Sequence, residues 1–264
     1  SWAANDELIF PKKLSLEQCS SELTAKYKTS LSTKSHEMTR KGFSEDSCNL
    51  ADKERILVDL TGGMGVDTSF LSDNFDKTYY VEMQEELCDI ARHNFKILNK
   101  NIEVVNDNAE HFLTTCGEVD CIYLDPARRD EYGRKMVSLH DCSPDVAELQ
   151  DVLFEKAKTV MVKLSPMLDI DIVKKELKNI KEIHSVAVKN ECKEILVILG
   201  QRTTDNGQQE LETQRRKDAK TQRGENSATL SLCDSATSLT ISATDLRENW
   251  NFSFTEDEEQ NAEW

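Results

Sequence analysis

Short apolar runs alternate with longer amphipathic stretches through the middle of the chain. Five of these runs predict buried strands: Arg55–Leu60, Thr78–Met83, Ile102–Asp107, Cys121–Pro126 and Thr159–Leu164. Between the second and third runs, residues 85–99 carry apolar side chains at three-to-four spacing, which predicts a helix with one buried face. Strands that alternate with helices imply right-handed crossovers and a mostly parallel sheet covered on both faces.

The last two strand-like runs lie too close together for a parallel connection. Ile183–Lys189 and Glu194–Gly200 are separated by residues 190–193 alone, so they must pair antiparallel. The pattern therefore predicts an α/β fold with a Rossmann-like, seven-stranded, mostly parallel sheet and an antiparallel last strand. With a parallel sixth strand, we expect the hairpin tip at Glu191–Lys193 to lie opposite the other strand ends.

The flanking regions divide the chain into three parts. We expect residues 1–54 to form a helical N-terminal extension. One or two helices span Leu14–Leu31, capped by Ser15, and a polar loop with a short helix follows over Ser32–Asp52. Residues 55–200 form the sheet domain. Residues 201–264 form a polar loop plus a β-hairpin extension, with strand-like runs at Thr229–Leu232 and Ser238–Ser242.

Composition and charge narrow the class of protein. Of 264 residues, 38% are hydrophobic and 31% charged, as in a globular protein, and neither a signal peptide nor a membrane-spanning run is found, so a cytoplasmic location is the default. The eight cysteines form no Cys-x-x-Cys pair, which disfavours a metal site and suggests reduced thiols. The net charge of -16 means that any nucleic-acid contact needs a local basic patch or a further module.

A strand-end carboxylate and a glycine turn follow the first strand. Asp59 precedes Gly63 and Gly65 in an Asp-x-x-x-Gly-x-Gly pattern, and a helix starts at Asp67. Glycines at such a turn let the backbone approach a ligand closely. A dinucleotide site would need a third glycine where Thr68 stands, so that class of ligand is disfavoured. A tight turn without a ligand is the alternative for this motif alone.

Two more acidic strand ends belong to the same edge. Glu82 closes the second strand, at the distance expected of an acid that accepts from both ribose hydroxyls of an adenosine. Asp107, Asn108 and Ala109 follow the third strand, where an adenine amino group would be recognised; a solvated loop acid is the equal alternative. Because carboxyl ends of parallel strands border one crevice, these residues predict a single cofactor site.

The fourth and fifth strands end in groups suited to a substrate. Asp125-Pro126 follows the fourth strand, and Asp125 is placed to orient a nucleophile. Arg128 and Arg129 suit a phosphate or carboxylate, with a salt-bridged loop as the equal alternative. Lys163 either lines the substrate mouth or neutralises the acidic edge, and we favour the second role.

These motifs together resemble a bacterial group of class I S-adenosylmethionine-dependent methyltransferases, widespread in Bacteroidetes, that carry a THUMP-like C-terminal domain. The resemblance covers about residues 10–200. It rests on Phe10-Pro11, Leu16–Glu22, Asp59–Gly65, Tyr123–Asp130, Lys163–Met167 and Asn190–Glu194. The chain is more distantly similar to RNA guanine-N2 methyltransferases of the cap-trimethylating kind.

The resemblance implies S-adenosyl-L-methionine as the cofactor and RNA as the substrate, methylated on a base nitrogen. The cofactor-binding residues are then Asp59, Thr61, Gly63, Gly65, Asp67, Glu82, Met83, Asp107, Asn108 and Ala109. The catalytic residues are Asp125, Pro126 and Arg128. The segment before the first strand folds over the cofactor in related enzymes, which makes Gln18, Ser20 and Ser21 candidate lid residues.

Two features of the resemblance leave alternatives open. Relatives have a further N-terminal helical region and a THUMP-like module, so we expect this chain to be part of a longer protein whose RNA affinity resides partly in that module. Amine-methylating enzymes carry a second proline and an aromatic ring where Ala127 and Arg128 stand here. A catalytically lapsed S-adenosylmethionine-binding protein that interacts with RNA is therefore the alternative. Thr68 and the terminal hairpin disfavour a nicotinamide-dependent dehydrogenase.

Overall fold

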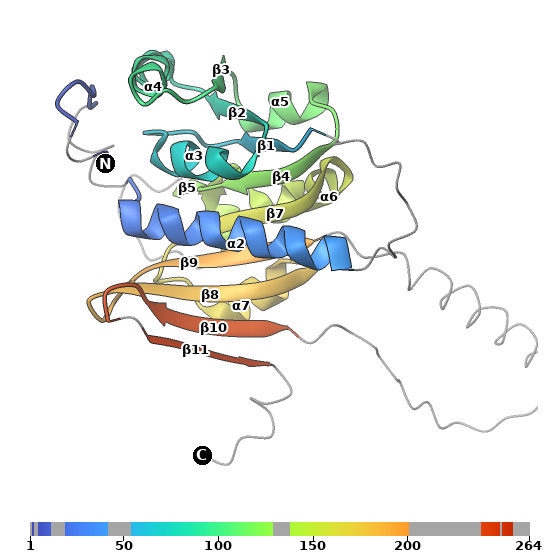
Figure 1. Ribbon diagram of the computed structural model, residues 1–264. Helices are drawn as coiled ribbons and strands as arrows, with labels where there is room; N and C mark the ends of the chain where they lie inside the picture. The colour runs from blue at the N-terminus through green and yellow to red at the C-terminus, as the bar shows by residue number, and fades with distance from the viewer. Residues whose placement is uncertain are drawn as a thin grey trace, which may run out of the picture.

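A computed structural model describes residues 2, 5–11, 19–41, 54–128, 138–200, 239–248 and 250–255. Within these residues, nine strands form one sheet in the order β11-β10-β8-β9-β7-β4-β1-β2-β3, with helices on both faces (Figure 1). Its parallel part consists of β1 (Ile56–Asp59), β2 (Lys77–Glu82), β3 (Ile102–Asn106), β4 (Val119–Leu124) and β7 (Ala157–Leu164). All five predicted strands are thus confirmed, and none of their ends is shifted by more than two residues.

The antiparallel hairpin at the end of the predicted domain is also confirmed. The strand β9 (Glu191–Gly200) pairs antiparallel with both β7 and β8 (Ile180–Val188), and thus lies between them. The connecting turn is tighter than expected: Lys189 and Asn190 alone form it, both with positive φ, as a two-residue hairpin turn requires. These seven strands have the strand order and the one reversed strand of the class I methyltransferase fold.

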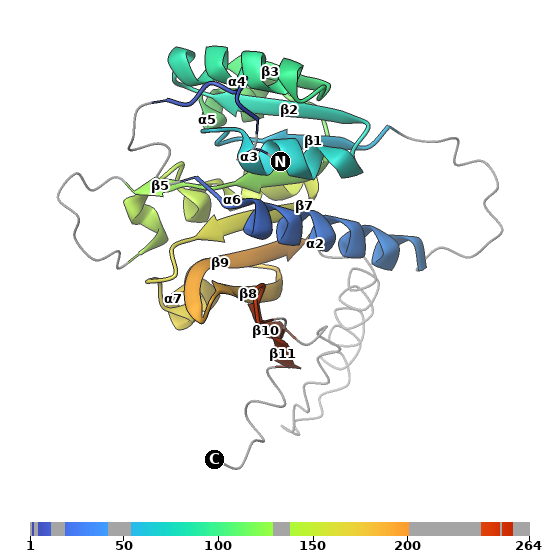
Figure 2. The same cartoon turned by 60° about the vertical axis from the view of Figure 1, so that its left-hand side comes forward.

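The hairpin tip lies on the other edge from the one predicted. Since β8 runs in the same direction as β7, it delivers the chain to the carboxyl edge of the sheet, where Leu164 pairs with Ile195. Figure 2 shows this turn on the same side of the sheet as the end of β7. The prediction was wrong because a hairpin after a parallel strand must turn where that strand ends. The start of β9 therefore joins the candidate site.

The chain after Gly200 returns to the same sheet. The strand β10 (Thr240–Asp245) pairs parallel with β8, and β11 (Trp250–Thr255) pairs antiparallel with β10. The strand expected at Ser238–Ser242 corresponds to β10, whereas β11 was not predicted. The run expected at Thr229–Leu232 lies outside the described residues.

Helices cover the two faces in separate groups. The helices α5 (Ala109–Thr115), α6 (Val146–Lys156) and α7 (Ile170–Glu176) pack on one face around the largest apolar core. On the other face lie α2 (Glu22–Lys41), α3 (Val66–Leu71) and α4 (Glu85–Ile97), with the short 3-10 turn η2 (Ser72–Asn74) after α3. None of the helices in the described ranges is long and apolar enough to cross a bilayer.

The helix α2 extends well beyond the predicted Leu31, into residues expected to form a loop. Its hydroxyl side chains donate to carbonyls of the preceding turn: Ser32 Oγ lies 2.8 Å, and Thr33 Oγ1 3.1 Å, from Thr29 O. Asn74 in η2 donates to Thr29 O and to Ser32 Oγ, both at 2.8 Å. Tertiary contacts thus stabilise a helix whose polar composition favours a loop. Ser15 and Gln18 lie outside the described residues.

Candidate active site

The glycine turn after β1 is closely packed against the second strand. Gly62 N donates to Val81 O at 2.9 Å, and a Cβ on Gly62 would lie 2.3 Å from the ring of Tyr80. Gly65 has a φ of +74°, and its Cβ would lie 2.6 Å from Phe95. By contrast, a Cβ on Gly63 would meet only Thr61 O, at 3.7 Å, among the described residues. The turn is therefore closed towards the protein and open at Gly63.

Asp59 supports this turn from beneath. Its side chain accepts from Thr61 N at 3.0 Å and from the Thr68 hydroxyl at 2.5 Å, and the residue is 1% exposed. Burial raises the pKa of the Asp59 carboxyl to about 7, with the carboxylates of Asp67 and Asp125 adding to the rise. A cation bound nearby would favour the ionised form. Thr68, which replaces a dinucleotide-type glycine, thus holds the strand-end acid in place.

Glu82 at the end of β2 faces the open part of the turn. One carboxylate oxygen accepts from Gly63 N at 3.0 Å and the other accepts from Gln84 N at 2.9 Å. Each oxygen keeps a second lone pair. Met83, the next residue, is 72% exposed. The structure thus brings a fixed bidentate acceptor and an exposed apolar side chain to one strand end.

The end of β3 carries a helix cap. Asn108 is the N-cap of α5, and its Oδ1 accepts from His111 N at 2.7 Å. The Asp107 carboxylate accepts from Asn108 N and contacts His111 Nδ1 at 2.7 Å, and the hydrogen bond from His111 holds the pKa of Asp107 below its usual value. Ala109 is buried in the first turn of the same helix. These three residues thus form the start of α5. Their predicted contact with the cofactor remains a prediction.

Both carboxylate oxygens of Asp67 bind side chains of the protein. Tyr123 Oη and Ser20 Oγ donate to its Oδ2 at 2.7 and 2.6 Å, and Lys28 Nζ lies 3.1 Å from its Oδ1. Burial works to raise the pKa of Asp67, but Lys28, Lys163 and the two hydroxyls outweigh it, and the pKa falls below its usual value. In this structure Asp67 connects α2, α3 and β4.

Lys28 is fully buried between two carboxylates. Besides Asp67, its Nζ contacts both oxygens of Glu194, at 2.9 and 2.8 Å, and Glu194 is 2% exposed. Burial raises the pKa of Glu194, an effect that Lys28 opposes. Ser20 also accepts from Lys28 at 3.0 Å, and Ser21 accepts from Thr24 N in the first turn of α2. Ser20 and Ser21, the two lid candidates among the described residues, thus hydrogen-bond to side-chain or backbone groups of α2.

Asp125 lies where β4 ends and forms an ion pair with Lys163 of β7. Lys163 Nζ is 2.5 Å from Asp125 Oδ2, and the two side chains are 13% and 35% exposed. Asp125 N donates to Thr61 Oγ1 at 2.6 Å, which joins this strand end to the glycine turn. Burial raises the pKa of Asp125, against the effect of Lys163. The half-buried Pro126 follows.

Beyond Pro126 the backbone of Ala127–Arg128 forms β5, which pairs antiparallel with β6 (Cys142–Ser143). Figure 2 shows β5 projecting beyond the end of β4 at the carboxyl edge. The backbone of Arg128 thus lies beside the candidate site, and Arg129 lies outside the described residues.

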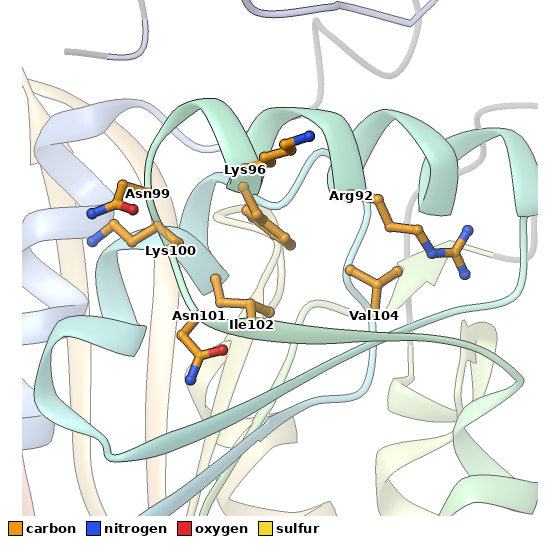
Figure 3. Close-up of a pocket in the computed structure, with 8 residues that line it drawn as sticks. Arg92, Lys96, Asn99, Lys100, Asn101, Ile102 and Val104 are labelled. Atoms are coloured by element: carbon orange, nitrogen blue, oxygen red, sulfur yellow. The ribbon is translucent and has the colours of Figure 1, made fainter.

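A surface hollow of about 550 Å³ lies elsewhere, between α4 and β3 (Figure 3). Three basic side chains line it, Arg92, Lys96 and Lys100, together with asparagines and apolar groups. Arg92 pairs with Asp89, and Lys100 with Asp73. Since none of the described residues that line this hollow is a strand-end carboxylate, we place the chemistry at the carboxyl edge. Among the described residues, no group of histidine, cysteine and acidic side chains is arranged to hold a metal ion.

Lys28, Glu194 and Tyr123 were not identified from the sequence. A faint signal exists for two of them. Lys28 lies on the face of α2 that includes the buried Ala25 and Leu31, and Glu194 directly precedes a run of six buried residues. A charge in a buried face indicates a partner, yet the sequence does not say which one.

Structural comparison supports the fold assignment. A proposed methyltransferase from Porphyromonas gingivalis W83 superposes over 99% of this chain with 28% identity and a TM-score of 0.69. This chain spans 54% of that protein. No protein-family model matches the sequence, and no curated protein does.

Two further structures are similar over a smaller part. An rRNA methylase from Streptococcus thermophilus covers 58% of the chain with 18% identity and a TM-score of 0.43, and the chain spans 90% of it. M. capricolum TrmK, in complex with S-adenosylhomocysteine, covers 58% with 12% identity and a TM-score of 0.42, and the chain spans 65% of it. Of these three, the P. gingivalis protein alone superposes over nearly the whole chain.

Proposed function

We propose that this protein is an S-adenosylmethionine-dependent methyltransferase. The observation that carries the proposal is the position of Glu82, whose two oxygens are fixed by Gly63 N and Gln84 N beside the open side of the glycine turn. A carboxylate fixed in this way suits the cis-diol of a ribose, because two acceptors then face two donors. The fold shared with the P. gingivalis protein supports the same proposal.

The neighbouring residues fit the rest of this cofactor. Asp59 lies under the turn with its pKa raised by burial, so a ligand ammonium would favour its ionised form. Met83 offers an exposed apolar surface for the adenine ring, and Asp107 and Asn108 stand at the next strand end. When bound, the cofactor supplies a methyl group on a sulfonium, which is already a strong electrophile.

RNA is the substrate that we propose, and the cytoplasm the location. Part of the affinity for RNA is supplied by a THUMP-like module outside this chain. The resemblance described above supports this choice. The hollow lined by Arg92, Lys96 and Lys100 gives an acidic chain one local basic surface (Figure 3). A base nitrogen is the acceptor that the resemblance implies, and it requires Asp125 to accept an amine hydrogen.

The alternative is a protein that binds the cofactor without transferring its methyl group. Ala127 and Arg128 favour it, because they stand where amine-methylating enzymes carry a proline and an aromatic ring. Incorporation of labelled methyl into RNA by the purified protein, abolished in Asp125→Ala, would exclude this alternative. Cofactor binding without any incorporation would support it.

Calorimetric titration with S-adenosylmethionine tests the cofactor assignment. Glu82→Ala is expected to weaken binding by about 100-fold, because two charge-assisted hydrogen bonds are lost. Glu103→Ala is the matched control: Glu103 lies on the neighbouring strand, is exposed and pairs with Lys77. Unchanged affinity in Glu82→Ala, with a normal unfolding transition, would remove the ribose assignment.

A further inference from the structure

The ion pair between Lys163 and Asp125 bears on the atom that receives the methyl group. Its ammonium lies 2.5 Å from Asp125 Oδ2, at the strand end where a substrate must meet the cofactor. Both side chains retain some exposure, so the pair borders the substrate side of the edge. We propose that the acceptor is a hydroxyl oxygen, and in RNA the ribose 2′-hydroxyl, rather than an amine nitrogen. This inference rests on the proposed function.

Lys163 is held as a cation by its surroundings. Burial works to lower its pKa, but the carboxylates of Asp125, Asp67 and Glu194 outweigh that effect, and the pKa rises above its usual value. Lys28 neutralises part of the charge of Asp67 and Glu194 by direct contact. Asp125 is therefore the carboxylate that Lys163 itself contacts, and the ammonium stays beside the acceptor position.

An ammonium there affects nitrogen and oxygen acceptors in opposite ways. An amine that attacks a methyl sulfonium gains positive charge in the transition state, and a nearby ammonium opposes that charge. A hydroxyl that loses its proton during attack gains negative charge on oxygen, which an ammonium stabilises. One oxygen of Asp125 already contacts Lys163, so the carboxylate has fewer free lone pairs for the two hydrogens of an amine.

The transfer to oxygen balances with the groups present. The acceptor oxygen forms a bond to the methyl carbon, the carbon–sulfur bond breaks, and its electron pair remains on sulfur as a neutral thioether. The hydroxyl proton passes to the carboxylate of Asp125, whose pKa is raised by burial, and leaves to solvent afterwards. Lys163 keeps its protons throughout and hydrogen-bonds to the oxygen as negative charge develops. In RNA the 2′-hydroxyl is the hydroxyl present on every internal nucleotide.

Alkaline hydrolysis of methylated RNA distinguishes the two acceptors. RNA from cells that lack the gene is incubated with the purified protein and S-adenosylmethionine labelled in its methyl group, then hydrolysed with alkali. Alkaline cleavage uses the 2′-oxygen as nucleophile, so a 2′-O-methyl group blocks it. We expect the label in alkali-resistant dinucleotides. Label in mononucleotides would overturn the inference and leave the proposed methyltransferase intact. An absence of label despite cofactor binding would refute RNA methylation itself, and this inference with it.

Variants of Lys163 test the role of the ammonium. Lys163→Met is expected to lower kcat at least about 100-fold while the cofactor Kd changes less than about threefold. Lys163→Arg, which keeps the charge, should recover part of the rate.

Lys158→Met is the matched control for these variants. Lys158 also connects β7 to β4, through Asp120 at 2.6 Å, but at the opposite edge of the sheet, so the rate should be unchanged. Near-normal turnover in Lys163→Met would contradict the inference, as would an equal loss in Lys158→Met.

Discussion

Replacing Lys28 with methionine is expected to lower the free energy of unfolding by about 3–5 kcal/mol, the range for removing one partner of a buried ion pair. Lys28 Nζ is the cation within 3.1 Å of Asp67 and within 3 Å of Glu194. Asp67 would keep its hydrogen bonds from Ser20 and Tyr123. Among the described residues, no other cation contacts the buried carboxylate of Glu194, so Glu194 accounts for most of the loss.

The pH dependence gives this prediction its sign. Burial already raises the pKa of Glu194, and loss of Lys28 raises it further. A carboxyl whose folded pKa exceeds its unfolded value contributes stability at low pH, and that contribution is lost as the pH rises through the folded pKa. The Lys28→Met variant should therefore be closest to wild type in acid and fall furthest below it at pH 8.

Urea unfolding followed by tryptophan fluorescence measures the change. Lys26→Met is the control, since Lys26 lies in the same helix but is exposed, and its pair with Glu22 is worth a few tenths of a kcal/mol. Lys28→Met with Glu194→Gln should recover about 2 kcal/mol of the loss, because the uncompensated charge is gone. A loss below about 1 kcal/mol in Lys28→Met, or no recovery in the double variant, would refute the ion-pair explanation.

Three further changes have defined outcomes. Gly62→Ala places a methyl group 2.3 Å from the buried Tyr80 ring, so the free energy of unfolding should fall by about 1–3 kcal/mol. Calorimetry should also show weaker cofactor binding. Wild-type stability and affinity in this variant would contradict the close packing of the turn. Asp59→Asn removes a buried carboxyl with a pKa of about 7. In the wild type, ionisation of this group between pH 4 and pH 8 lowers the free energy of unfolding by up to about 4 kcal/mol. This pH-dependent fall should be smaller in the variant. Asn94→Leu removes two 2.9 Å hydrogen bonds to the Ile9 backbone, so the Ile9 amide should exchange its hydrogen faster. Unchanged exchange would show that these hydrogen bonds do not hold the segment at Ile9 in place.

The local sequence pattern was enough to predict the seven central strands and the two acidic residues that end β1 and β2. Asp59 and Glu82 end strands whose apolar runs are visible in the sequence, and parallel topology then brings their carboxylates to one edge. The glycine spacing likewise predicted the turn at Gly65, because the positive φ of this residue and the nearby Phe95 ring leave no room for a side chain. These features depend on neighbours in sequence or in adjacent strands, so periodicity captures them.

Features that depend on distant partners were missed or misplaced. Asn74, which hydrogen-bonds to α2 near the predicted helix end, is 42 positions from Ser32 and 45 from Thr29 in the sequence. The hairpin tip was predicted at the wrong edge even with β8 taken as parallel, because a parallel strand carries the chain to the carboxyl edge before the turn. Lys163 was expected to neutralise the acidic edge, and the ion pair agrees with that role, but its partner Asp125 follows only from the pairing of β4 with β7.

The sequence by itself determined the seven central strands, the turn at Gly63 and the strand-end acids Asp59 and Glu82, because hydrophobic periodicity and backbone sterics act over a few residues. The tertiary structure alone decided which charges meet. Lys28 and Glu194 are 166 positions apart, and burial gives their contact its energy. A buried charge needs a partner, but only the packing of α2 against the carboxyl edge selects which one.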